Sequence, residues 1–156
     1  MRGVGKIGDI FAGEGLTSDT HTAGNKDGLL RTLEEMKQSF DGFIFVNLVD
    51  FDSVYGHRND VKGYLGALEE TDELLASVVH AMLPGDMLIV TADHGCDPAF
   101  PGTDHTREDV PLLMCIKGEA GGRDLGECRG FMTVGDTVLD YLGLEQMHDC
   151  SVLKKD

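Results

Sequence analysis

The sequence predicts an α/β fold, a three-layer α/β/α sandwich on a mainly parallel sheet, and two observations support this. Short apolar, β-branched runs at residues 43–49, 87–91 and 110–116 alternate with stretches whose apolar residues recur at helical spacing. Such alternation is typical of a parallel sheet covered by helices on both faces. With 156 residues, 41% of them apolar, the chain fits one domain and can bury a substantial core.

The N-terminal part of the chain gives one strand and one helix. The first 25 residues are rich in Gly, Thr and Ser, and only residues 4–11 have the pattern of an ordered segment, read as a strand. A helix is expected next, because apolar residues recur at helical spacing, namely Leu29, Leu30, Leu33, Met36 and Phe40. Asn25 and Asp27 are both candidates for its N-cap.

The remaining elements follow in order along the chain. Residues 43–49 predict a buried strand, and a long amphipathic helix is expected over residues 61–82. Asn59 or Asp60 could cap that helix, and Pro84 with Gly85 should end it. Strands are expected at residues 87–91 and 110–116, then a Gly-rich charged loop at 118–130 and a last helix over 133–142.

The composition excludes several classes of function. A formal net charge of −15 argues against nucleic acid or an acidic membrane as partner, because the phosphates would be repelled. No apolar run reaches the length of a membrane span, and the first residues do not lead into a signal-peptide core, so we expect a cytoplasmic protein. The four cysteines form no CxxC pair and are expected to be free thiols, with Cys115 in the core.

One glycine motif needs to be set aside. Residues 3–8 read GVGKIG and formally match the dinucleotide-binding pattern GxGxxG. That fingerprint requires a strand before the glycines and a helix after them. Only two residues precede Gly3 and no helical pattern follows Gly8, so we reject a dinucleotide site here.

Five potential metal ligands occur in two tight clusters. Each cluster directly follows a predicted strand, at residues 43–49 and 87–91, where the ligand loops of an open parallel sheet usually lie. Carboxylates and imidazoles suit Mn²⁺, Fe²⁺ or Zn²⁺, and two such ions held close together are a common clamp for phosphoryl transfer. The sequence therefore predicts a paired divalent-metal site formed by Asp52, His57, Asp93, His94 and His105.

Other polar residues have competing interpretations. A single loop histidine is more often a surface residue than a ligand, and His80 and His148, which lack neighbouring ligands, are read as solvated. His21 is ambiguous between surface and substrate contact. Four charged residues beside the second cluster either orient ligand imidazoles by hydrogen bonds or form a solvated loop, namely Asp97, Asp104, Arg107 and Glu108.

The ligand-bearing stretches resemble phosphopentomutase. They are VDFD with YGHR at 49–58, TADHGCDP at 91–98 and PGTDHTRE at 101–108. Similar segments are VGKI and DIFAGEG at 4–15, NKDG at 25–28, DLG at 124–126 and VGDTV at 134–138, so the resemblance covers essentially the whole chain. The ADHG sequence alone would indicate only the wider alkaline-phosphatase superfamily, whereas TDHTRE is more specific.

The resemblance implies an activity, a cofactor and residue roles. Phosphopentomutases interconvert ribose or deoxyribose 1-phosphate and the 5-phosphate with two Mn²⁺ ions and a phosphorylated threonine. By motif, Asp93 and His94 would bind one ion and Asp52, His57 and His105 the other. Lys6 falls where the family has a basic residue near the substrate phosphate. The implied partner is a phosphorylated pentose, and the implied fold is an alkaline-phosphatase-like core.

The resemblance also implies that residues 1–156 form only the C-terminal portion of the catalytic core. In the family the nucleophilic threonine, a further aspartate ligand and a cap domain belong to an N-terminal segment, and nothing here resembles the nucleophile segment. The core would then be incomplete at its N-terminal side, the catalytic residue would lie outside this chain, and the N-terminal half of the enzyme would be a partner. Alternative interpretations are a metal-dependent phosphatase, a phosphoglycerate mutase relative, or an inactive metal-binding fragment.

Overall fold

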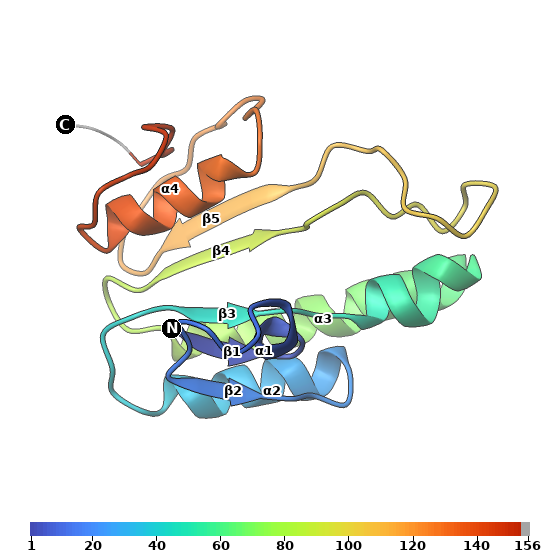
Figure 1. Ribbon diagram of the computed structural model, residues 1–156, viewed down its shortest axis with the longest axis horizontal. Coiled ribbons are helices and arrows are strands. Elements are labelled where there is room, and N and C mark those ends of the chain that lie inside the picture. The colour runs from blue at the N-terminus through green and yellow to red at the C-terminus, as the bar shows by residue number, and fades with distance from the viewer. Residues whose placement is uncertain (154–156) are drawn as a thin grey trace. The chain divides into compact units, whose positions relative to one another are not determined.

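The computed structural model describes residues 1–153, which fall into two compact units, Met1–Glu119 and the part of Ala120–Asp156 up to residue 153. The second unit contains one helix, α4 (Met132–Tyr141), and irregular segments around it. The first unit contains both sheets and the candidate metal ligands (Figure 1). Its elements are β1 (Arg2–Val4), α1 (Ile7–Ile10), β2 (Ser18–Thr20), α2 (Asn25–Met36), β3 (Ile44–Val46), α3 (Val61–Ala81), β4 (Met87–Thr91) and β5 (Leu112–Ile116).

The strands of the first unit form two sheets. Three parallel strands pair in the order β2-β1-β3, with Gly3 opposite both Asp19 and Phe45. Strands β4 and β5 pair with each other and run antiparallel, with Ile89 opposite Met114. Helix α2 packs on β1, β3 and α3, and both long helices lie behind the parallel strands in Figure 1. The α/β class is confirmed, although β5 joins β4 antiparallel rather than extending the parallel sheet.

The N-terminal segment differs from the prediction, because residues 4–11 do not form one strand. The strand ends at Val4, and Gly5 turns the chain with a φ of 89°, so that α1 begins at Ile7. A side chain at position 5 would place its Cβ 2.4 Å from the carbonyl oxygen of Asn47. The carboxylate of Asp19, in the unpredicted strand β2, accepts a hydrogen bond from the Gly8 N–H at 3.1 Å. These contacts link residues far apart in sequence, which local patterns do not reveal.

Helix α2 has its N-terminal donor satisfied by a residue from outside the helix. Neither predicted cap is used, since the N-cap is Gly24 and makes no side-chain hydrogen bond. Instead, the Asp50 carboxylate accepts from the Asn25 N–H at 2.7 Å, and the Asn25 side-chain oxygen accepts from the Asp50 N–H at 2.9 Å. This reciprocal pair ties the start of α2 to the loop after β3, which carries the first group of metal-ligand candidates.

The long helix and the two later strands agree closely with prediction. The carboxylate of Asp60 accepts from the Gly63 N–H at 2.9 Å, which confirms one of its two candidate caps. Strand β4 has the predicted bounds, and α4 begins and ends one residue before the predicted helix. Between β3 and α3 the chain makes two short helical turns, Phe51–Tyr55 and Gly56–Arg58, that contain Asp52 and His57.

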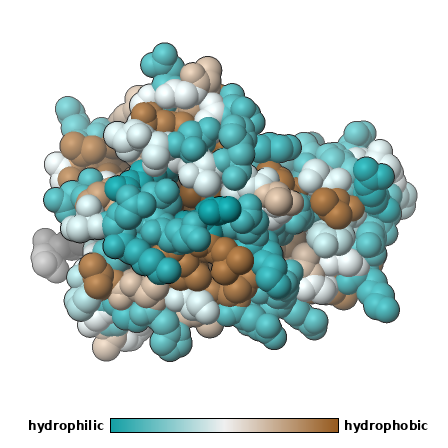
Figure 2. Space-filling model, turned by 90° about the horizontal axis from the view of Figure 1, so that it is seen from below, coloured by the Kyte–Doolittle hydropathy of each residue, from teal (hydrophilic) through white to brown (hydrophobic). Residues whose placement is uncertain are grey.

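The hydrophobic core of the described residues lies in the first unit. Its most buried apolar side chains come from β1, α1, α2, α3 and the residue after α3, and are Val4, Ile7, Leu29, Val78 and Met82. Apolar residues also interrupt the hydrophilic surface in separate places (Figure 2), and Ile10 and Leu30 are among the exposed ones. All four cysteines are free, as predicted, but Cys115 is exposed rather than in the core. None of the helices in residues 1–153 combines the length and apolar content needed to span a bilayer.

The second unit is organised around one buried carboxylate. Asp136 of α4 accepts hydrogen bonds from the backbone N–H groups of Met147, His148 and Cys150 at 3.0, 2.9 and 3.1 Å. The Cys150 thiol is a fourth donor, with its Sγ 3.3 Å from the carboxylate. Burial alone would raise the pKa of Asp136, but these donors outweigh it and lower the pKa to about 2. The carboxylate therefore holds the C-terminal segment on α4.

Candidate metal centre

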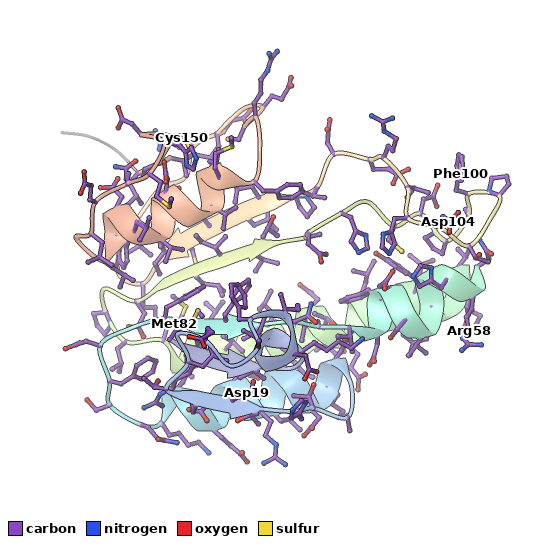
Figure 3. The ribbon with its side chains drawn as sticks, in the orientation of Figure 1. Asp19, Arg58, Met82, Phe100, Asp104 and Cys150 are labelled. Carbon is purple, nitrogen blue, oxygen red and sulfur yellow. The ribbon has the colours of Figure 1, made fainter. Side chains whose placement is uncertain are left out.

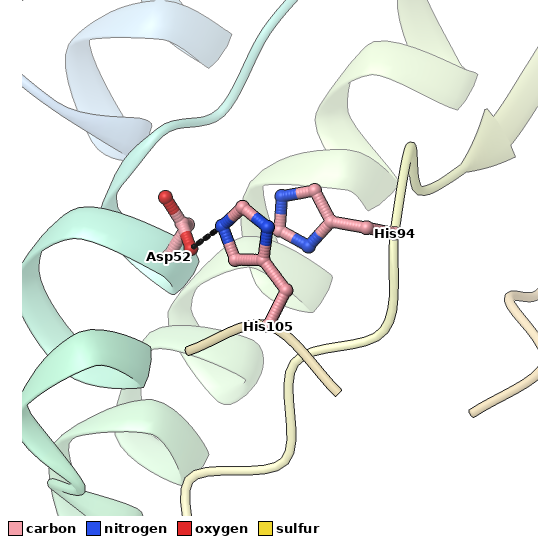
Figure 4. Close-up of side chains that lie close together, drawn as sticks. All are labelled: Asp52, His94 and His105. Carbon is pink, nitrogen blue, oxygen red and sulfur yellow. Dashed lines mark ion pairs between the residues drawn. The ribbon is translucent and has the colours of Figure 1, made fainter. Parts of the chain in front are cut away.

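Three of the five predicted ligands form a tight group in the first unit. One ligand atom from each of Asp52, His94 and His105 lies within 4.8 Å of the others (Figure 4). The rings of His94 and His105 stack with centroids 3.6 Å apart and planes 16° from parallel. The Nε2 atom of His105 lies 3.2 Å from Asp52 Oδ1. The loops after β3 and β4 therefore converge, as their positions at strand ends predicted.

His57 joins this group through the same carboxylate oxygen. Its Nε2 lies 3.2 Å from Asp52 Oδ1, and its ring stacks on His105 with centroids 5.1 Å apart. The Nδ1 of His57 contacts the carbonyl oxygen of Thr103, which can only accept a hydrogen bond. In the neutral ring Nδ1 therefore carries the proton, which leaves a lone pair on Nε2, the nitrogen that faces Asp52.

His94 has its tautomer fixed in the same way. Its Nδ1 donates to the carbonyl oxygen of Gly95 at 3.0 Å, so the lone pair of the neutral ring is again on Nε2. Ligand histidines usually donate their other ring N–H to a carbonyl or a carboxylate, which fixes the ring orientation. The arrangement around His57 and His94 is thus the one that metal ligation requires.

The Asp52 carboxylate provides a direct test of whether a cation would fit. Its Oδ1 is buried and has no hydrogen-bond partner among residues 1–153, although two Nε2 atoms lie only 3.2 Å away. A buried carboxylate oxygen without a donor is unfavourable, because it has lost water and gained nothing in exchange. A divalent cation would complement this oxygen together with the Nε2 lone pairs of His57 and His94. The donor set therefore fits Mn²⁺, Zn²⁺ or a similar ion.

The remaining two predicted site residues lie outside the tight group. The Asp93 side chain is 79% exposed, and its Oδ1 is 3.6 Å from His94 Nε2. Lys6 is exposed and lies two residues after β1. Because β1 and β3 are parallel, Lys6 and the Asp52 loop both follow the C-terminal ends of their strands, at the same end of the sheet. The structure thus groups His94 with Asp52 and His105, whereas the resemblance divided these residues between two ions. The roles of all six residues remain predictions.

Close packing behind the ligands involves residues that the sequence did not single out. Gly56, which directly precedes His57 in the sequence, is buried, and a Cβ there would lie 2.2 Å from the Cys96 sulfur. Burial, with the nearby carboxylates of Asp52 and Glu108, raises the pKa of the Cys96 thiol, so this side chain is a protonated packing group. Glycine at position 56 therefore allows the second cluster to approach the first.

Asn59 joins the two ligand segments at a further point. Its side-chain nitrogen donates to the carbonyl oxygens of Pro98 and Phe100 at 3.2 and 3.0 Å, and its φ of 52° is a value that asparagine tolerates better than most residues. Phe100 and Asp104 belong to the loop that lies beside the short helical turns before α3, and Arg58 of those turns points away from this loop (Figure 3). The left-handed preference of asparagine is the only sequence signal that could have indicated this contact.

The fold and this ligand group define a class of metal-dependent α/β enzyme, and comparison with known families agrees. The family model described as the metalloenzyme superfamily matches residues 6–146. The chain therefore belongs to the metalloenzyme superfamily, and the alkaline-phosphatase-like core predicted from the sequence is confirmed. A divalent-metal-binding protein is the coarse identification that the fold, the ligand group and the family share.

The most similar relatives include phosphopentomutases from several bacteria. The phosphopentomutase of Anaeromyxobacter sp. strain K is 54% identical over 142 residues, which cover 91% of this chain and 36% of that protein. Those of Caldanaerobacter subterraneus and Kosmotoga olearia are 50% and 47% identical over 93% and 98% of this chain. The predicted resemblance to phosphopentomutase is confirmed, and the chain spans between 36% and 39% of the length of these relatives.

Proposed function

We propose that residues 1–156 form the C-terminal portion of the metal-binding catalytic core of a phosphopentomutase. The proposed reaction interconverts ribose or deoxyribose 1-phosphate with the corresponding 5-phosphate, in the cytoplasm. The observation that carries the proposal is the convergence of Asp52, His94 and His105 within 4.8 Å. It gains weight because the chain is about half identical to phosphopentomutases over more than nine-tenths of its length.

The proposed cofactor is a pair of Mn²⁺ ions or similar divalent cations. The residues that would hold them are Asp52, His57, Asp93, His94 and His105. An imidazole nitrogen of each histidine lies 3.6 Å or less from a carboxylate oxygen of Asp52 or Asp93. The stacked rings of His94 and His105, with centroids 3.6 Å apart, join the two groups. When bound, such ions neutralise phosphoryl oxygens and align the donor with the acceptor. A chain with a net charge of −15 needs that positive charge to attract a sugar phosphate.

The chain's own residues supply orientation and charge at this site. His57 and His94 each donate Nδ1–H to a backbone carbonyl, which holds Nε2 toward the Asp52 carboxylate or beside it. Lys6, exposed at the same sheet edge, is proposed to contact the substrate phosphate. An ammonium group there would add an electrostatic contact without taking part in bond breaking.

We further propose that the phosphorylated threonine comes from the part of the longer relatives that lies outside the match, and that this part is a partner of the present chain. Two open sheet edges support this proposal. Among residues 1–153, β3 pairs only with β1 and β4 pairs only with β5. The unpaired edges of β3 and β4 offer backbone donors and acceptors to a further strand, and the loops after these same strands carry the metal-ligand candidates.

A chimera tests the proposal directly. The 142-residue stretch of this chain that matches the phosphopentomutase of Anaeromyxobacter sp. strain K would replace the corresponding stretch of that protein. With Mn²⁺ we expect conversion of ribose 1-phosphate to ribose 5-phosphate, and the Asp52→Ala and His94→Ala chimeras should lose it. Release of free phosphate in place of ribose 5-phosphate would favour a phosphatase. A folded chimera with neither activity would overturn the mutase proposal. If the chain alone still bound Mn²⁺ in that case, the interpretation as an inactive metal-binding fragment would be favoured.

A further inference from the structure

His94 and His105 lie on two segments of the connection between β4 and β5, and these segments are joined at one carbonyl oxygen. Gly95 and Thr106 form an isolated antiparallel bridge, in which the Thr106 N–H donates to the Gly95 oxygen at 3.1 Å. The same oxygen accepts from His94 Nδ1 at 3.0 Å. One backbone group therefore fixes the ring of the first histidine and the residue that follows the second.

The Thr106 hydroxyl makes a second link between these two segments. Its oxygen accepts from the Asp97 N–H at 2.7 Å and donates to the Glu108 carboxylate. A hydroxyl can donate and accept at once, and a methyl group in its place can do neither. Asp97 lies three residues after His94, and Glu108 lies three residues after His105, so this chain of bonds joins the two ligand-bearing segments of the β4–β5 connection.

Tight packing leaves little freedom around this connection. Gly95 is buried, and a Cβ at that position would lie 2.6 Å from a Glu108 carboxylate oxygen and 2.7 Å from the Thr106 carbonyl oxygen. Gly95 directly follows His94, and Thr106 directly follows His105. The rings of these two histidines stack with centroids 3.6 Å apart. A loosely solvated loop would not show this convergence, although Glu108 itself is exposed at the protein surface.

We propose that Thr106 and Glu108 are positioning residues, which hold His94 and His105 in register with Asp52 and thereby set the affinity of the metal centre. This inference rests on the proposed metal-binding function. Thr106 acts through the Gly95 bridge and the Asp97 N–H, and Glu108 acts by accepting the hydrogen bond that the Thr106 hydroxyl donates. Neither residue needs to contact the metal or the substrate.

Mn²⁺ titration calorimetry of the full chain tests the proposal. We expect Thr106→Val to weaken Mn²⁺ binding about tenfold or more, as for other groups that orient metal ligands. Thr106→Ser should stay within about threefold of the parent, because it keeps the hydroxyl. Glu108→Ala should resemble Thr106→Val, while Glu108→Gln, which keeps an acceptor oxygen, should be closer to the parent. Thr71→Val is the matched control, since that threonine lies on α3, outside both ligand clusters.

A second measurement separates positioning from general stability. Nitrogen-15 spectra of the imidazole rings in the metal-free chain report the tautomers of His94 and His105, and Thr106→Val should change them while Thr106→Ser should not. Parent-like Mn²⁺ affinity and parent-like ring spectra in folded Thr106→Val and Glu108→Ala would overturn the proposal. If Asp52→Asn also left Mn²⁺ binding unchanged, the failure would instead lie with the metal-binding function. Should Thr106→Val not fold, Glu108→Ala against Glu108→Gln decides.

Discussion

Asp52 and Asp136 both bury carboxylate oxygens, but the chain surrounds the two in opposite ways. Three backbone N–H groups and a thiol donate to Asp136, and its side chain is only 3% exposed. Asp52 Oδ1 is also buried, yet it has no hydrogen-bond partner among residues 1–153, and the nearest nitrogens, Nε2 of His57 and of His105, lie 3.2 Å away. A carboxylate satisfied by its own chain stabilises the fold, whereas one that is surrounded by imidazole rings and has no hydrogen-bond partner among residues 1–153 is suited to a cation.

Substituting Asp52 should produce the largest effect. Asp52→Asn removes the only carboxylate of the tight group, and we expect Mn²⁺ affinity to fall by at least about 100-fold, beyond the usual effect of residues that only orient ligands. The melting temperature of the metal-free protein should stay the same or rise slightly, because Oδ1 has no hydrogen bond to lose. Calorimetry and thermal unfolding at pH 8 measure the two quantities. A clear loss of stability without loss of Mn²⁺ binding would reverse the contrast with Asp136.

Sequence patterns predicted the parts of the fold that depend on local periodicity. The bounds of α3, β4 and α4 follow from runs of apolar residues, and the Asp60 cap follows from its place before the first turn. The break at Gly5 was missed because glycine permits a positive φ without requiring it, and because the contact with Asn47 that requires glycine is distant in sequence. The capping of α2 was missed because Asp50 lies 25 residues after Asn25. Tertiary contacts decided those elements.

The candidate site shows the same division between local and distant information. The five metal-ligand candidates could be found because ligand-type residues follow two predicted strands. The Thr106 hydroxyl and the Gly95 carbonyl could not, because their importance depends on two segments of the β4–β5 connection meeting in space. Asp136 was missed for a similar reason, since an aspartate on a helix usually faces water and its donors lie 11 to 14 residues away.

Substituting Asp136 should reverse the outcome seen with Asp52. Asp136→Asn places an amide NH₂ or a weaker acceptor against three N–H donors, and we expect the melting temperature to fall by roughly 5–10 °C. Mn²⁺ affinity should be unchanged, since the tight ligand group belongs to the other unit. Thermal unfolding by circular dichroism measures the first and calorimetry the second. A stability equal to that of the parent would show that the donors do not depend on the charge.

The pH dependence of stability gives Asp136 a second, independent signature. Its pKa is about 2 in the folded chain against an ordinary value of 3.8, so the charged form is favoured by folding. Its contribution is therefore complete above about pH 4 and is lost as the pH falls toward 2, where the folded carboxyl also takes up a proton. The amide chemical shifts of Met147, His148 and Cys150 should change over the same pH range, because these amides donate to the carboxylate. In Asp136→Asn the part of the acid-induced loss of stability that is due to Asp136 should be absent. Parallel acid profiles for the two proteins would contradict the assignment.

Asp93 should give the smallest effect and thereby mark the limit of the open site. Its side chain is mostly exposed, and among residues 1–153 its ion-pair contact is with His94 at 3.6 Å, so no described contact holds it toward the other ligands before metal binds. A ligand that must be ordered on binding contributes less than one already in place. We expect Asp93→Asn to weaken one Mn²⁺ site by about tenfold or less, with Asp104→Asn as a charge-matched control in the same region. If Asp93→Asn weakened Mn²⁺ binding as much as Asp52→Asn, metal binding would have to draw the Asp93 side chain into the ligand group. The metal site would then include more than the ligands already held close to Asp52 Oδ1.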